Sequence, residues 1–384
     1  MRKFAIFLMA LFLPFAAFAC PDENGSCETY SITLNTNGGT TEYTELSYLT
    51  STGVEYIDTG IQFELAYDFI VSGNFINPAT VRKVIIGSFC KNNEVAFNIE
   101  LTNVGQLRNF VATGAGNSRD VSSKIKLPTN TLISYNVYYN ATEHKITNYL
   151  EYNGSTQHYD VSSVISGPDN NLVNLKMFLD NRTGNMYGID QPVSIGTTRF
   201  YKAGVLVGNF IPVRRNSDNV LGFYDTVTGT FKTNGSGTGA FVAGPDVGPF
   251  PANYIHDVVG AMVANNLTHP HGTFVAWCDD SNLTTNCTTT KSIAASATGN
   301  KTLYAKWQCD AGYGNHNGSC LPLCTAGITK FHVGNGVSFN LYRDRITAPS
   351  FNVMYNNTVC YVGVETGRGQ LNFSDGTNIW HATY

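Results

Sequence analysis

Acidic side chains are the first place to look for chemistry in this 384-residue chain, because paired carboxyl groups can cleave glycosidic bonds. Enzymes that retain configuration hold two carboxyls about 5.5 Å apart. Residues two apart on a β-strand meet this requirement, since alternate side chains point to the same face. No two Asp or Glu residues have that spacing. The sequence therefore predicts no catalytic residue, and a polysaccharide hydrolase with carboxyls from separate strands stays as an alternative.

Histidines and glycine-rich turns give little sign of a metal or phosphate site. The one close pair among the eight His residues is His269 and His271, and no HExxH motif is present. We interpret this pair as a turn with two solvated imidazoles, with metal binding as the weaker alternative. The glycine-rich segment 235–239 lacks the Lys and following helix that hold phosphate, and we interpret it as a hairpin loop. GxSxG and P-loop motifs are also missing.

Nine cysteines in a chain with an export signal suggest disulfides. Local spacing offers four candidate pairs, which are Cys20 with Cys27, Cys278 with Cys287, Cys309 with Cys320, and Cys324 with Cys360. Spacing alone does not establish the pairing. Cys90, at the end of an apolar run, is interpreted as a buried, inert thiol. Zinc binding by Cys309, Cys320 and Cys324 is the alternative, but no paired CxxC spacing supports it.

The N-terminus has the pattern of a secretory signal peptide over residues 1–19. Arg2 and Lys3 precede an apolar run, and the segment 17–19 (Ala-Phe-Ala) provides a small-x-small cleavage site. Cys20 follows directly, so lipidation of Cys20 is an alternative to plain secretion, although Ala17 stands where lipoprotein signals favour Leu. No later stretch is long and apolar enough to predict a transmembrane segment. We expect an exported protein of the cell envelope or the extracellular space.

Composition favours a multi-module β-protein. Charged residues make up 14% of the chain, whereas there are 37 Gly, 21 Tyr and 23 Phe, which is typical of short strands and turns rather than helical bundles. Loss of residues 1–19 changes the formal charge from −4 to −6, and no basic run is longer than that of Arg214 and Arg215. Nucleic acid is therefore not an expected partner.

Alternating polar and apolar residues predict strands through most of the chain. We expect them at 30–34, 95–101, 132–139, 146–152, 176–179, 200–207, 274–277 and 303–307, with further strands after 337. Glycines and prolines at 235–251 mark a boundary. One helix is expected after Asn253, because Ile255, Val258, Val259, Met262 and Val263 fall at helical spacing.

Three sequence fragments together resemble the internalin-type B repeat, a small β-grasp unit of bacterial surface proteins. They are ITLNTNGGT at 32–40, followed much later by FVAWCDD at 274–280 and TLYAKW at 302–307. The resemblance implies structural roles for Trp277, Tyr304 and Trp307, with sugar stacking by the tryptophans as the alternative. It also implies a first strand at 28–43 and the remainder of the repeat at 253–308. Either a domain is inserted between them, which we favour, or the first match is accidental.

The segment between these fragments resembles a concanavalin A-like (laminin G-like) jelly roll. VEYIDTGI at 54–61 and GNFIPVRRNSDNVLGFYDTVTGTFKTNGSGTGAF at 208–241 carry the resemblance, which implies a β-sandwich at 44–244. A cysteine-bearing connector at 309–324 and a small β module at 325–384 complete the expected organisation.

The expected function is non-catalytic binding or adhesion, with a glycan or a surface protein as the partner. A spacer that holds another protein away from the envelope is a further alternative. Tyr residues could form a sugar platform, but no individual Tyr can be chosen from the sequence. No cofactor is identified, and calcium sites in jelly rolls draw on separate loops that leave no contiguous signature.

Overall fold

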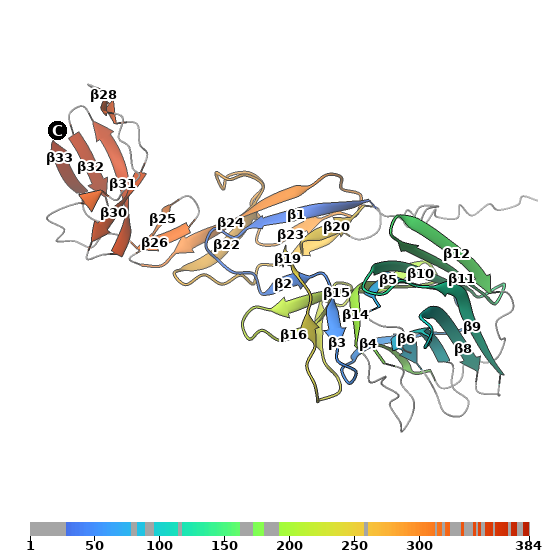
Figure 1. Ribbon diagram of the computed structural model, residues 1–384. Coiled ribbons are helices and arrows are strands. Elements are labelled where there is room, and N and C mark those ends of the chain that lie inside the picture. The colour runs from blue at the N-terminus through green and yellow to red at the C-terminus, as the bar shows by residue number, and fades with distance from the viewer. Residues whose placement is uncertain are drawn as a thin grey trace, which may run out of the picture.

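The protein is described by a computed structural model covering residues 28–77, 83–88, 96–113, 117–161, 172–179, 192–256, 260–311, 313–316 and 319–322, and strands between 332 and 383. The fold is mainly β, as predicted, and contains a jelly-roll-like sandwich (Figure 1). The described part contains no helix, hence none able to cross a membrane. The predicted signal peptide 1–19 and Cys20, Cys27, Cys90 and Cys324 lie outside the described residues, as does the side chain of Cys360.

The larger sheet of the sandwich forms a path of eight strands with four more attached. The path is β12 (Ser155–Val161), β11 (Lys145–Tyr152), β10 (Leu132–Asn140), β5 (Phe69–Ile76), β14 (Val193–Lys202), β15 (Val205–Arg215), β16 (Leu221–Asp225) and β17 (Thr230–Thr233). The attached strands are β2 (Tyr43–Leu46), β3 (Leu49–Ser51), β18 (Val242–Ala243) and β19 (Asp246–Pro249).

A six-stranded sheet covers one face of the larger sheet. Its order is β4 (Ile57–Gln62), β13 (Asn174–Met177), β6 (Lys83–Ser88), β7 (Ala96–Leu101), β8 (Gln106–Thr113) and β9 (Asn117–Lys126). Phe69 of β5 and Phe97 of β7 meet edge to face in the shared core, with ring centroids 5.8 Å apart. Because alternate residues of each strand enter this core, the intervening residues of the larger sheet lie on its other, outer face.

A separate small sheet brings together distant parts of the chain. It contains β20 (Asn253–Ile255), β1 (Thr29–Asn35), β24 (Lys301–Cys309) and β22 (Gly272–Cys278), and β1 is parallel to β24. A two-stranded sheet, β21 (Ala261–Val263) with β23 (Lys291–Ile293), contributes to the same core. Figure 1 shows these strands above the β2, β14 and β15 end of the larger sheet, with β10–β12 extending away from them.

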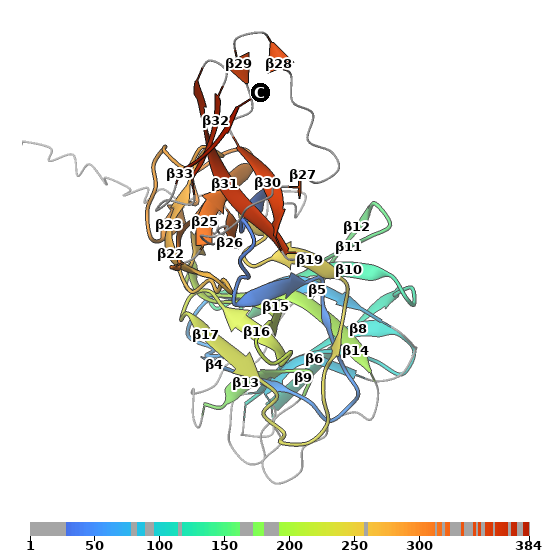
Figure 2. The ribbon, with the colours of Figure 1, turned by 90° about the vertical axis from the view of Figure 1, so that its left-hand side faces the viewer.

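The remaining strands form the C-terminal end of the molecule (Figure 2). They are β25 (Tyr313–His316) with β26 (Ser319–Pro322), β28 (Leu341–Tyr342) with β29 (Arg345–Ile346), and a sheet of β27 (His332–Val333), β30 (Ser350–Tyr355), β31 (Thr358–Gly367), β32 (Gln370–Ser374) and β33 (Ile379–Thr383).

The predicted helix after Asn253 is wrong. Residues 253–255 form β20 along β1, and residues 261–263 form β21 along β23. The apolar residues of this segment do fall at helical spacing. The two segments pair instead with the open edges of β1 and β23, because contacts in the tertiary structure outweigh the local preference of the sequence. Gly260 lies so close to the carbonyl oxygen of Ile293 that a Cβ there would sit 2.1 Å from it.

Two turn predictions also need correction. The strand expected at 200–207 is two strands, because Ala203 and Gly204 turn with φ values of 48° and 78° and join β14 to β15. Positive φ at both central residues is the geometry of tight hairpins. The glycine-rich segment 235–239 is not a hairpin loop, since β17 before it pairs with β16 and β18 after it pairs with β3.

Candidate functional site

A cleft of about 650 Å³ lies between the larger sheet and the small-sheet region. Its floor comes from the outer face of β5, β14 and β15, and includes Asn74, Arg199 and Asn209. The opposite wall is formed by β20, β21 and β23, and includes Tyr254 and Met262. The volume is in the range of small-ligand sites, and two structural units form its walls, which is a common place for such sites.

Several floor atoms have no hydrogen-bond partner among the described residues. They are the Oδ1 atoms of Asn74 and Asn209 and the Nε–H of Arg199. Asn209 is 2% exposed, and its Nδ2 donates to Thr226 Oγ1 at 2.7 Å while its Oδ1 is unpartnered. Each buried polar atom left unsatisfied costs about 1–3 kcal/mol. These atoms are themselves covered by the protein, so a ligand in the cleft reaches them only if the floor rearranges.

A β-bulge shapes the floor beside Asn74. The pairing of β14 with β5 shifts register between Ile195 and Thr198. Gly196 lies in this bulge, and a Cβ there would approach Asn74 Oδ1 to 1.8 Å. Bulges of this kind often re-aim side chains near functional sites. The absence of a side chain at Gly196 therefore makes room for the amide of Asn74.

The floor continues as a row of residues across six strands. Successive Cα partners in the larger sheet are His158, Tyr149, Asn136, Ser72, Arg199 and Asn209, one on each of β12, β11, β10, β5, β14 and β15. We call this set the polar row. Five inter-strand steps of about 4.8 Å give the row a length of about 24 Å. Such a length matches several sugar rings better than a single one.

The two ends of the polar row differ in character. At the β12 end, Tyr149 and His158 stack with ring centroids 4.8 Å apart, and His158 is exposed. In the middle, Asn136 is half-buried and its Oδ1 has no partner among the described residues. At the β15 end, Asn209 is buried in the cleft. The row therefore leads from an open aromatic face into a closed polar one.

Two carboxylates, Glu42 and Glu45, also line the cleft. Glu45 accepts hydrogen bonds from the Ala252 N–H at 2.8 Å and from Asn253 Nδ2 at 3.4 Å, one on each oxygen. Burial raises the pKa of Glu45, and these bonds and Arg199 oppose the rise. Burial likewise lowers the pKa of Arg199, against the influence of Tyr201 and Glu45. Glu45 thus joins the two walls of the cleft.

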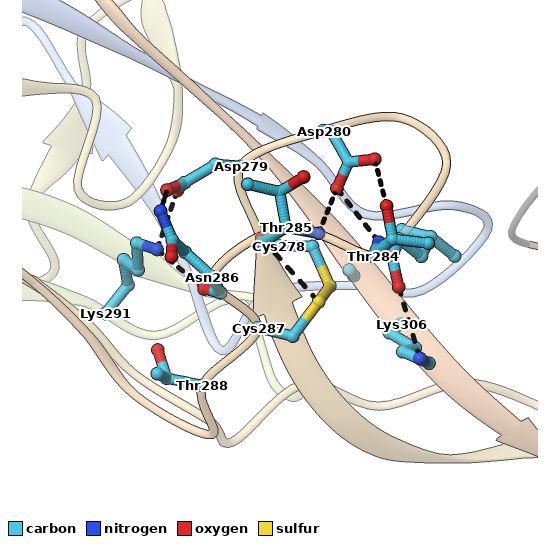
Figure 3. The surroundings of a disulfide bond; sticks show 12 residues. Cys278, Asp279, Asp280, Thr284, Thr285, Asn286, Cys287, Thr288, Lys291 and Lys306 are labelled. Carbon is cyan, nitrogen blue, oxygen red and sulfur yellow. Dashed lines mark hydrogen bonds and ion pairs between the residues drawn. A yellow bond between two sulfur atoms is a disulfide. The ribbon is translucent and has the colours of Figure 1, made fainter.

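The structure contains two of the four candidate disulfides. Cys278 is bonded to Cys287, and Cys309 to Cys320, with Cα separations of 4.1 and 5.4 Å. Figure 3 shows the loop closed by the first. Asp280 Oδ1 accepts the N–H groups of Thr284 and Thr285 at 2.9 and 2.7 Å, while Asp279 pairs with Lys291 at 2.6 Å. Both acids therefore hold the loop together.

Two of the three predicted repeat residues, Trp277 and Trp307, lie in the small-sheet core. Trp277 and Trp307 are 0% and 4% exposed, and their Nε1–H groups donate to the carbonyls of Ala264 and Thr36, each at 2.9 Å. Tyr304 is half-buried on β24. Neither indole offers an open face to a sugar.

The histidine pair is placed differently from the solvated turn we expected. His269 packs on Trp307 with ring centroids 4.9 Å apart, and His271 stacks on Tyr313 at 3.9 Å. Burial and His271 lower the pKa of His269. Both rings are half-buried because aromatic neighbours cover them. Among the described residues, no group of three His, Cys, Asp or Glu side chains could hold a metal ion.

Sequence reasoning did not identify the floor of the cleft. Asn74 is far in the chain from Arg199 and Asn209, which share the β14–β15 hairpin, and the three residues match no motif. The available signal was that they are polar residues at outward positions of strands with apolar neighbours on the core side. Polar residues at outward positions occur both on sheet faces that are open to solvent and on faces that another unit covers, so this signal does not distinguish the two.

Comparison with known proteins identifies no family for this chain. No family model matches it, and no curated protein is similar to it. Solved structures with some similarity include the LG4-5 domains of the mouse laminin α1 chain, with 13% identity, a TM-score of 0.30, and 96% of this chain and 72% of that one covered.

Two further structures illustrate the range of these similarities. Lectin I from Ulex europaeus, in complex with a methyl glycoside of α-L-fucose, has 12% identity and a TM-score of 0.28, covering 46% of this chain and 98% of its own. The K499G mutant of the NanB sialidase from Streptococcus pneumoniae has 12% identity and a TM-score of 0.34, with 90% and 61% covered. These values are too low to transfer a ligand or an activity.

Proposed function

We propose that this chain is an exported, non-catalytic binding protein of the bacterial cell envelope that recognises a glycan through the cleft and the polar row. The observation that carries the proposal is the polar floor of the cleft, formed by Asn74, Arg199 and Asn209 on the outer face of the larger sheet, with the polar row leading out from it. Sugar hydroxyls both donate and accept, so a sugar can bind a floor made of amide and guanidinium groups. The stacked Tyr149 and His158 supply an apolar face at the other end.

The proposed organisation keeps the boundaries expected from the sequence. Residues 1–19 direct export, with Cys20 as a lipidation candidate, and residues 44–244 form a sandwich inserted between the 28–43 and 253–308 parts of a β-grasp repeat. The pairing of β1 with both β20 and β24 supports the insertion. Residues 309–324 connect this part to the β module at 325–384. A purely structural spacer is the rival that requires no ligand.

A polysaccharide hydrolase is the second candidate, because Glu42 and Glu45 line one cleft. Glu45 argues against it. Both of its oxygens already accept hydrogen bonds from residues 252–253, which leaves this carboxyl poorly placed to act on a substrate.

A glycan array probed with the full chain tests the proposal, followed by calorimetric titration with the best sugars. We expect a coherent set of glycans to bind, and Arg199→Gln and Asn209→Ala to weaken binding about tenfold or more. Arg215→Gln is the matched control, because Arg215 lies on β15 but pairs with Asp218. No binding to any glycan would contradict the proposal. Release of reducing ends from a polysaccharide panel would favour the hydrolase.

A further inference from the structure

A lysine and an asparagine are enclosed together inside the sandwich, and neither of them lines the cleft. Lys83 is the first residue of β6 and is 1% exposed, and Asn77 directly follows β5 and is 0% exposed. Lys83 Nζ donates a hydrogen bond to Asn77 Oδ1 at 3.3 Å. The fold therefore places an amine against a side-chain amide, away from water.

The backbone holds both residues at this contact. Lys83 is the Cα partner of Leu101 on β7, and directly opposed side chains lie on the same face of a sheet. Leu101 belongs to the core between the two sheets, so the side chain of Lys83 enters this core as well. The backbone carbonyl of Asn77 accepts the N–H of Asn130 at 2.8 Å, which fixes the chain where it leaves β5.

The pair is costly to bury in its present form. A buried ammonium group loses its hydration, and burial lowers the pKa of Lys83 to about 8. A neutral amine has the lone pair that a nucleophile needs. Asn77 Nδ2 is covered and has no hydrogen-bond partner among the described residues. A covalent bond between the two side chains would remove both the buried charge and the unpartnered amide group.

We propose that Lys83 and Asn77 form an intramolecular isopeptide bond. Lys83 Nζ attacks Asn77 Cγ, the atom that carries the contacted Oδ1. A bond forms between Nζ and Cγ, the bond between Cγ and Nδ2 breaks, and a proton passes from Nζ to Nδ2, which leaves as ammonia. The step involves no change of oxidation state and no co-reactant. Holding the two groups in contact raises their effective concentration, so the reaction depends on the fold.

The bond would join the two sheets of the sandwich covalently, between the end of β5 in the larger sheet and the start of β6 in the six-stranded sheet. Burial does not prevent this reaction, because both reactants belong to the chain and none has to enter from solvent. Since the two groups meet in the folded core, chains kept in denaturant should stay without the bond.

Mass spectrometry of the full, folded chain tests the proposal after incubation at about pH 9, above the pKa of the Lys83 amine. We expect a mass lower by one molecule of ammonia than that of the same chain kept in denaturant. Trypsin should leave the peptides on the two sides of Arg82 joined, and it should not cleave after Lys83, because an acylated lysine is not a substrate. Unchanged mass, or a loss of ammonia with these peptides separate, would overturn the proposal.

Matched variants identify the residues. Lys83→Met and Asn77→Ala each remove one reactant, so each should keep the full mass and release separate peptides. Lys176→Met is the control, because Lys176 is also buried in the six-stranded sheet but lies over the ring of Tyr56, 4.2 Å from its centroid. It should still lose ammonia. Thermal unfolding shows whether each variant is folded, and joined peptides in either Lys83→Met or Asn77→Ala would overturn the proposal.

Discussion

Trp307 of β24 donates from its Nε1–H to the carbonyl oxygen of Thr36, at 2.9 Å and across 271 residues of sequence. Its ring also covers Gly39, where a Cβ would lie 2.2 Å from Trp307 Cζ2. The turn after β1 and the end of β24 therefore fit together as one packed unit. The sandwich, which lies between them in sequence, follows β1 and ends before the chain returns to the small sheet at β20.

Gly39→Ala should destabilise the small sheet by about 1–3 kcal/mol, because the added methyl group would overlap the indole ring. Trp307→Phe should also destabilise, since it removes ring atoms and the bond to Thr36. The double variant should lose less than the sum by about 1 kcal/mol or more, because the smaller ring leaves space for the methyl group. Urea unfolding of all four proteins measures this coupling, and strict additivity would refute the packing argument.

Removing the disulfide by Cys278→Ser with Cys287→Ser should lower stability by about 2–3 kcal/mol, since the reduced chain gains freedom in the unfolded state. Chemical denaturation measures the loss. Peptide mapping of the oxidised wild-type protein should recover the two cysteines in one linked pair. Recovery of both cysteines as free thiols would show that this disulfide does not form.

Stability should fall as pH rises through the range above the ordinary pKa of a glutamate side chain, in proportion to the ionisation of Glu45. Burial raises the pKa of Glu45 in the folded protein, so the folded state holds this proton more tightly than the unfolded state. The stability that Glu45 contributes is fully present below its pKa in the unfolded state. It is lost as the pH rises through its pKa in the folded state.

The variant Glu45→Gln should flatten that part of the pH profile, because Gln is neutral throughout and can still accept the Ala252 N–H. Thermal unfolding from pH 4 to pH 8 compares the two proteins. Asp218→Asn serves as the control. Because Arg215 lowers the pKa of Asp218, the stability that Asp218 contributes is lost as the pH falls rather than as it rises. An unchanged slope in Glu45→Gln would assign the pH dependence to other groups.

Tyr149→Ala should weaken binding of a long glycan about three- to tenfold while leaving a short oligosaccharide in the cleft unaffected, since Tyr149 lies on β11, three strands from Arg199 in the polar row. Titration with a polymer and with its di- and trisaccharides measures the difference. Tyr67→Ala is the control, because Tyr67 is exposed on a turn outside the row. Equal losses for long and short ligands would show that the row does not extend the site.

Strand alternation predicted the sandwich well because its core is regular. The hairpin of β10 and β11 follows residues whose apolar side chains enter the core at every second position. The helix after Asn253 failed for a different reason, since a short apolar segment adopts whichever structure its neighbours can pair with. Which edges are open is a property of the assembled sheets.

The cleft could not be predicted from sequence at all. Arg199 and Asn209 face each other across a hairpin, but Glu45 and Asn253 reach the same cleft only because the sandwich and the small sheet meet there. Contacts of this kind depend on how two units dock. The spacing of residues in the sequence does not indicate how the two units pack against each other.

The connection between the two units has a mechanical consequence. The chain enters the larger sheet through β2 and leaves it through β19, which are antiparallel neighbours, and β2 is also hydrogen-bonded to β15. A force that pulls the small sheet away from the sandwich would act on β2 and β19 from the same end, so it would pass to the larger sheet through the hydrogen bonds between β2 and β15.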